Sequence, residues 1–147
     1  MSATEWLEDV LPNEPSWRIE ETVKLAGILA DHGVDLVDIS SGGNSAQGRI
    51  SLSRRPGYQV PIAEAVKKAH GHKVLVSAVG ALHTGLVAQS VLDEGKADVV
   101  FVGRLFQKNP GVVWTFADEL GVELHHSKQL GWGFQGRAKV EEDNLKN

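Results

Sequence analysis

The chain of 147 residues contains no cysteine, a single methionine and a single tyrosine. Without cysteine it can form neither a disulfide framework nor a thiol active site, and this is typical of a cytoplasmic protein. No apolar run approaches the length that spans a membrane, and the chain does not open with a basic segment followed by an apolar one. We therefore expect a cytoplasmic protein with no membrane partner.

The chain also has no excess of positively charged residues. Fifteen Lys and Arg residues stand against 19 Asp and Glu residues, which gives a formal net charge of −4. This balance argues against a broad role in binding nucleic acids, which are recognised through basic surfaces. The length and the 41% hydrophobic content suit one domain with a real core. We expect that domain to comprise residues 1–147, with residues 133–147 as a flexible tail.

The most informative stretch is Ala97 to Leu105. Val99 to Val102 are four consecutive apolar residues without polar alternation, which predicts a strand buried on both faces, as in a parallel sheet covered by helices. Gly103 and Arg104 follow directly. A glycine lets backbone N–H groups approach an anion, and an arginine adds a forked, charge-assisted contact. The pair predicts a phosphate site, and the alternative is a plain strand-to-helix turn with an exposed arginine.

Strand-length apolar runs alternate with helical periodicity along the chain. Helix signals include Ser16 and Thr84 as N-caps, Pro61 in a first turn, and Gly33 as a C-terminal stop. Strands are predicted over 34–39, 74–78 and 99–102, helices over 17–32, 61–69, 84–94 and 110–120, and loops over 44–57 and 106–109. This order predicts parallel βα units. A closed eight-stranded barrel needs about 200 residues or more, so the chain is either an open sheet or part of a barrel.

Four ordered motifs carry a resemblance to a known family. They are VDLVDISSGG (34–43), PGYQVP (56–61), VSAVG (76–80) and DVVFVGR (98–104), followed by Asn-Pro at 109–110. The chain resembles the C-terminal part of the Old Yellow Enzyme family, flavin-dependent ene-reductases also named NADPH dehydrogenases or NADH:flavin oxidoreductases. The likeness is greatest to the thermophilic-like bacterial branch and its fungal relatives.

The resemblance implies a fold and a site. The family fold is a (β/α)8 TIM barrel with FMN at the carboxyl ends of its strands. Residues 2–4 would be the end of strand five, and 34–39, 74–78 and 99–102 would be strands six, seven and eight of this α/β barrel. The backbone around Gly80 and Ala81, together with Gly103 and Arg104, would hold the FMN phosphate.

The resemblance also implies a function. In the intact family NAD(P)H reduces FMN, and the flavin passes a hydride to an activated alkene or quinone. The catalytic residues lie upstream of the part that this chain resembles, so we expect the FMN phosphate-binding half of such an oxidoreductase without its catalytic half. The alternative is a non-catalytic half-barrel that needs a partner chain or self-associates. A third reading is an unrelated α/β protein with an open sheet and a phosphate site.

Other polar groups suggest no further chemistry. His70 with His72 and His125 with His126 lack a recognisable metal-ligand spacing, so we expect surface histidines. Tyr58 precedes a helix in a Gly-Tyr-Gln setting, which favours packing or hydrogen bonding at the base of a loop over proton donation. The aspartates at 35 and 98 stand before apolar runs and are expected to make hydrogen bonds where strands begin.

Overall fold

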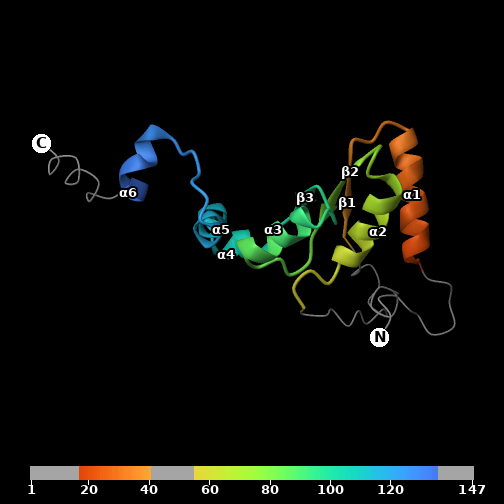
Figure 1. The fold of residues 1–147 in the computed structure, drawn as a ribbon, viewed down its shortest axis with the longest axis horizontal. Coiled ribbons are helices and arrows are strands. Elements are labelled where there is room, and N and C mark those ends of the chain that lie inside the picture. Colours follow the sequence, from red (N-terminus) through yellow and green to blue (C-terminus); the bar gives the residue numbers. More distant parts are fainter. Residues whose placement is uncertain (1–16, 41–54, 136–147) are drawn as a thin grey trace, which may run out of the picture.

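The structure, a computed structural model, describes residues 17–40 and 55–135. The strand end predicted at 2–4 and most of the polar loop predicted over 44–57 lie outside these residues. The N-cap predicted at Ser16 is wrong, because the first helix begins at Ile19 with Arg18 as its N-cap, where the Glu21 carboxylate accepts from the Arg18 N–H at 2.7 Å. In the described part, helices and strands alternate as far as β3, and helices follow (Figure 1). The elements are α1 (Ile19–Asp31), β1 (Leu36–Ile39), α2 (Val60–His70), β2 (Leu75–Ala78), α3 (Gly85–Asp93), β3 (Val99–Val100), α4 (Arg104–Lys108), α5 (Val112–Leu120), η2 (Lys128–Leu130) and α6 (Gly131–Gln135).

The three strands form one parallel sheet in the order β1-β2-β3. Val37 of β1 pairs with Val76 of β2, and Ala78 of β2 pairs with Val100 of β3. Parallel neighbours joined by helical crossovers are what the alternating pattern predicts, and that prediction is confirmed. The result is an α/β fold around a small parallel sheet, and its carboxyl ends all open on the same side.

Helices cover one face of this sheet. Helix α2 packs against both α1 and β2, and α3 packs against β3 and α5. The core between these layers consists of small and β-branched side chains from both, so helices and strands approach closely. Its most buried members are Ala26, Ile39, Val60, Ile62, Ala63, Val66, Val74, Val76, Ala78, Leu82, Val91 and Ala97.

The opposite face of the sheet is largely uncovered by the described elements. Leu75 of β2 and Phe101, just beyond β3, are 48% and 41% exposed on it. The prediction of a strand over 99–102 buried on both faces is therefore wrong: the strand ends at Val100, and its residues are only half-buried. The physical reason is that an apolar run is buried only where another layer packs on it, and the described elements leave this side of β3 largely uncovered. The Phe101 N–H still donates to the Ala78 carbonyl at 2.8 Å.

Capping residues define two of the predicted helix ends. The Thr84 hydroxyl accepts from the Val87 N–H at 3.3 Å, and Gly121 ends α5 with φ of 65°. Both follow the sequence prediction. The predicted loop over 106–109 is wrong, because residues 104–108 form helix α4, closed by the Asn109 N–H donating to the Leu105 carbonyl at 2.8 Å. A single helical turn is too short to show a helical period in the sequence.

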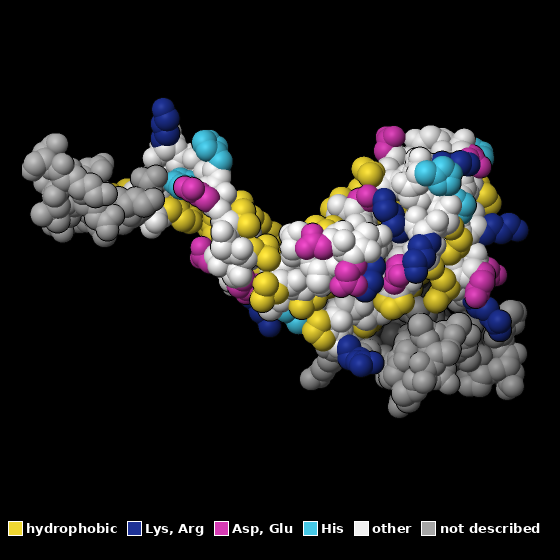
Figure 2. Space-filling view, viewed as in Figure 1, with side chains coloured by type: hydrophobic (Ala, Val, Ile, Leu, Met, Phe, Trp, Pro, Cys, Tyr) yellow, Lys and Arg dark blue, Asp and Glu magenta, His cyan; other side chains and the backbone are white. Residues whose placement is uncertain are grey.

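Beyond α5 the chain extends away from the sheet as an arm that carries η2 and α6 (Figure 1). The rings of Trp114 and Phe134 lie 4.9 Å apart and join α5 to this arm. Apolar side chains line the arm in Figure 2, and Trp132 is 74% exposed. Of the predicted tail, Gly133 to Gln135 belong to α6, and the remainder lies outside the described residues.

Candidate functional site

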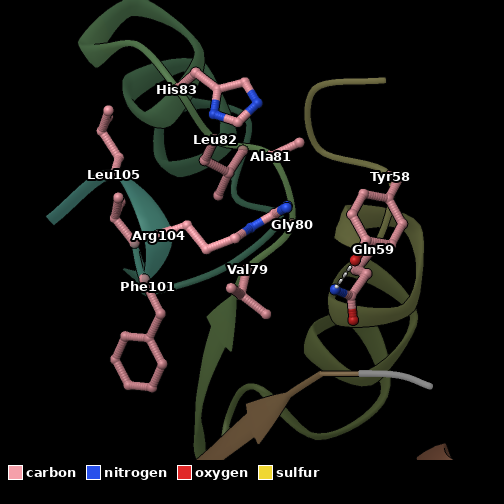
Figure 3. A pocket seen from close by; sticks show the side chains of 12 residues that line it. Tyr58, Gln59, Val79, Gly80, Ala81, Leu82, His83, Phe101, Arg104 and Leu105 are labelled. Atoms are coloured by element: carbon pink, nitrogen blue, oxygen red, sulfur yellow. Dashed lines mark hydrogen bonds between the residues drawn. The ribbon is translucent and has the colours of Figure 1, made fainter. Parts of the chain in front are cut away.

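A pocket of about 210 Å³ lies at the carboxyl ends of β2 and β3 (Figure 3). Its walls come from the loop that follows each strand and from the turn before α2. We call it the β2–β3 pocket. It is lined by Tyr58, Gln59, Val79, Gly80, Ala81, Leu82, His83, Phe101, Val102, Gly103, Arg104 and Leu105. The structure thus brings together all four residues that sequence analysis singled out, Gly80, Ala81, Gly103 and Arg104.

Gly80 and Ala81 form a sharp turn at the end of β2. Both have positive φ, 115° and 53° respectively. A β-carbon at position 80 would lie 3.0 Å from the Tyr58 ring and 3.2 Å from the Gln59 side chain, so only glycine fits. The Gly80 carbonyl accepts from the Gly57 N–H at 2.8 Å, which ties this turn to the loop before α2.

Gly103 and Arg104 form the second wall. Gly103 is the N-cap of α4 with φ of −97°, and a β-carbon built there would meet nothing within 4 Å. Neither backbone conformation nor internal packing therefore requires glycine at this position. Arg104 is exposed, and its guanidinium reaches toward Gly80 in Figure 3. Within the described residues it makes no ion pair.

The two loops present several free hydrogen-bond donors. In the part of the chain that the structure describes, the backbone N–H groups of Gly80, Ala81, Gly103 and Arg104 donate to no protein acceptor. Four such N–H groups around the β2–β3 pocket place partial positive charges of the backbone next to any ligand bound there. The arrangement suits a small anion with several acceptor oxygens.

The charge of the lining favours an anion as well. Its ionisable side chains are Tyr58, His83 and Arg104, and no carboxylate is among the described residues that line the pocket. Among the described lining residues, an anion held here would meet one permanent positive charge and no carboxylate. Because unlike charges attract and like charges repel at short range, the lining selects for negative ligands.

Tyr58, Gln59 and His83 also line this pocket, although no sequence pattern predicts it. Tyr58 was expected to pack or hydrogen-bond at a loop base, and it does: its hydroxyl accepts from Gln59 Nε2 at 2.9 Å (Figure 3). The Gln59 side chain is buried, with 4% of its surface exposed. Tyr58 and Gln59 reach the pocket because the turn at Gly80 lies against Gly57. This is a tertiary contact, and no local sequence pattern predicts it.

The other candidates lie apart from the pocket. No cluster of three potential metal ligands occurs among residues 17–40 and 55–135. The imidazole of His70 packs against Gly27. Asp38 accepts a 2.6 Å hydrogen bond from the Ser77 hydroxyl across β1 and β2. The part of the chain that the structure covers has no helix of the length and apolar character that would cross a membrane.

Comparison with known proteins identifies relatives that match three quarters of the chain or more. It is 52% identical to an NADH:flavin oxidoreductase of Gibberella zeae over 145 residues, which cover 95% of this chain and 34% of that protein. It is 39% identical to an NADPH dehydrogenase of Geobacillus thermodenitrificans over 118 residues, 79% of this chain and 33% of that protein. A protein of the same name from Bacillus pumilus is 38% identical over 111 residues, 76% of this chain and 31% of that protein. No family model matches. The chain spans about a third of the length of these relatives.

Proposed function

This chain belongs with the NADH:flavin oxidoreductases and NADPH dehydrogenases of the Old Yellow Enzyme type, and we propose that it forms their FMN phosphate-binding part. In this proposal β1, β2 and β3 are strands six, seven and eight of a (β/α)8 barrel. The β2–β3 pocket receives the phosphate of FMN. The observation that carries the proposal is the convergence of Gly80, Ala81, Gly103 and Arg104 on one pocket with free N–H donors.

The chemistry of the pocket supports a phosphate in particular. A phosphate monoester offers three acceptor oxygens and up to two negative charges. The N–H groups of two adjacent loops can each donate to one oxygen, and Arg104 can add a charge-assisted bond. In barrels of this class the loops after the last two strands frequently bind phosphate. The absence of an internal reason for glycine at position 103 also fits a ligand that approaches the backbone closely.

When bound in the complete protein, FMN would accept hydride from NADH or NADPH and deliver it to an activated alkene or quinone. The residues of this chain would bind and orient the cofactor at its phosphate end. None of the described side chains in the pocket is assigned to proton transfer. We therefore expect the chain by itself to bind FMN weakly and to reduce no alkene.

Titration of FMN, followed by its fluorescence, tests the site, with riboflavin as the matched ligand because it lacks only the phosphate. Wild type should prefer FMN, and Arg104→Ala should reduce that preference about tenfold, the value of a hydrogen bond to a charged group. Lys108→Ala, at the other end of α4, is the control and should leave the preference unchanged. Equal binding of FMN and riboflavin by wild type would contradict the phosphate assignment.

A second experiment tests the assignment of catalysis to another part of the protein. The purified chain is mixed with FMN, NADPH and an enone, and NADPH oxidation is followed by absorbance. We expect no enone-dependent oxidation above the rate of free FMN. Enone-dependent NADPH oxidation by wild type that is lost in Arg104→Ala would show that this chain is catalytic by itself.

The alternative is a half-barrel that works by assembling with another chain, and the uncovered sheet face favours it. Leu75 and Phe101 expose apolar surface, and in the described part of the chain β1 and β3 each leave one edge unpaired. Unpaired edges and exposed apolar faces promote association. Sedimentation at several concentrations distinguishes a monomer from a self-associating half-barrel.

A further inference from the structure

We propose that His83 is a second cationic contact for the phosphate in the β2–β3 pocket, so that affinity for a phosphate monoester depends on pH. The inference rests on the proposed function and extends it from phosphate binding to its regulation. His83 lies in the loop between β2 and α3, three residues after Gly80, and lines the same pocket as Arg104. Figure 3 shows the imidazole projecting from this loop at the edge of the pocket.

The two cationic side chains come from opposite walls. His83 follows β2, whereas Arg104 begins α4 after β3. Both are exposed, so each can move toward a ligand that enters between the loops. A phosphate bound to the N–H groups of Gly80 and Gly103 would leave oxygens directed outward. These are the oxygens that side chains at the pocket edge can reach.

The charged neighbours of His83 are few among the described residues. Arg104 and the Tyr58 hydroxyl share the pocket with it. From α5, the Glu119 carboxylate reaches this region and accepts a hydrogen bond from the Gly85 N–H, two residues after His83. That carboxylate already has a donor at the start of α3. No described carboxylate lines the pocket to compete with a ligand for the protonated imidazole.

The pH dependence has a definite sign. An imidazole ordinarily gains its proton near pH 6.5, and a phosphate monoester loses its second proton near pH 6, both approximate values. A bound phosphate attracts the imidazole only while the imidazole carries its proton. The extra affinity is therefore present at the acidic end of this range and is lost towards its alkaline end. Arg104 keeps its charge throughout, so its contact does not change over this range.

The test compares the preference for FMN over riboflavin at about pH 6.2 and pH 8. At the lower pH, the preference of wild type for FMN over riboflavin should exceed that of His83→Gln by about two- to fivefold, the range for exposed ion pairs. At pH 8 the two should agree. His72→Gln, an exposed histidine beyond α2, is the control and should behave as wild type. A second readout is the NMR titration of the His83 ring, whose midpoint should rise with FMN but not with riboflavin.

The outcomes separate the two proposals. If wild type prefers FMN in an Arg104-dependent manner but His83→Gln has the same preference at both pH values, the role of His83 is wrong and the phosphate site stands. If FMN has no advantage over riboflavin at either pH, both proposals are wrong. If FMN leaves the midpoint of the His83 titration unchanged, the contact is also refuted, whatever the affinities.

Discussion

Lys67 Nζ lies 2.6 Å from Asp98 Oδ1, so that one ion pair ties helix α2 to the residue that precedes strand β3. The other carboxylate oxygen of Asp98 accepts from the Val76 N–H at 2.9 Å. The side chain of Asp98 therefore joins α2, β2 and the start of β3 at the end of the sheet opposite the pocket. Both members of the pair are about one-fifth exposed.

This contact makes stability dependent on pH. Partial burial by itself raises the pKa of Asp98, but the hydrogen bonds from Lys67 and the Val76 N–H outweigh it and hold the pKa below its ordinary value. The stabilisation is complete above the unfolded-state pKa of about 3.9 and is lost as the pH falls through the lower folded-state value. Asp98→Asn should lower the free energy of unfolding at neutral pH by about 1–2 kcal/mol.

Urea unfolding at a series of pH values measures this. The difference between wild type and Asp98→Asn should shrink below about pH 4, where the carboxyl of Asp98 is protonated in the unfolded chain before it is protonated in the folded one. Asp31→Asn is the control, because its 2.8 Å pair with Lys73 is exposed and should contribute nothing measurable. A difference that stays constant down to pH 2 would contradict the role given to the charge.

Two glycines of the pocket should respond differently to alanine. Gly80→Ala should destabilise the fold by about 1–3 kcal/mol, because φ of 115° and the Tyr58 ring both oppose a β-carbon. Gly103→Ala should leave the unfolding midpoint unchanged, since its surroundings are open, yet weaken FMN binding. Thermal unfolding and FMN titration of both variants check this. Equal stability of the two variants would show that the turn at Gly80 is not as described.

The contact between Gly27 and His70 predicts an energetic coupling between α1 and α2. An alanine at position 27 would place its β-carbon 2.6 Å from His70 Cε1, which offsets the usual gain of about 1 kcal/mol from replacing glycine within a helix. In the His70→Ala background the clash is gone. Gly27→Ala should then stabilise the chain by about 1 kcal/mol, and a double-mutant cycle of unfolding free energies measures it. Additive effects would contradict the close packing.

The uncovered sheet face predicts association. Replacing Leu75 and Phe101 together by serine should reduce self-association and the binding of a hydrophobic dye, because both are large apolar side chains with nearly half of their surface exposed. Leu86→Ser is the control, since Leu86 is 62% exposed on α3, away from this face. Sedimentation velocity compares the variants. If the control reduces association as much as the double variant, another surface is responsible.

The sequence predicts the parallel sheet and most helix ends because their signals are local. Thr84 can cap and Gly121 can end a helix whatever lies around them. The position of the site is also predicted from local signals. The sequence has Gly80 after β2 and Gly103 after β3, and parallel strands bring their carboxyl ends together. The prediction of a loop over 106–109 was wrong because a single turn of helix is too short to show a helical period in the sequence. Tyr58 and His83 were not predicted as pocket residues, because their position beside the pocket depends on tertiary contacts rather than on a local pattern.

The proposed function requires a phosphate between the loops of Gly80–Ala81 and Gly103–Arg104. Amide chemical shifts of the 15N-labelled chain during titration with FMN, corrected by the same titration with riboflavin, test this position residue by residue. The largest phosphate-dependent shifts should occur at the N–H groups of these four residues. Shifts confined to other regions, such as residues 122–131 beyond α5, or no difference between the two ligands, would contradict it.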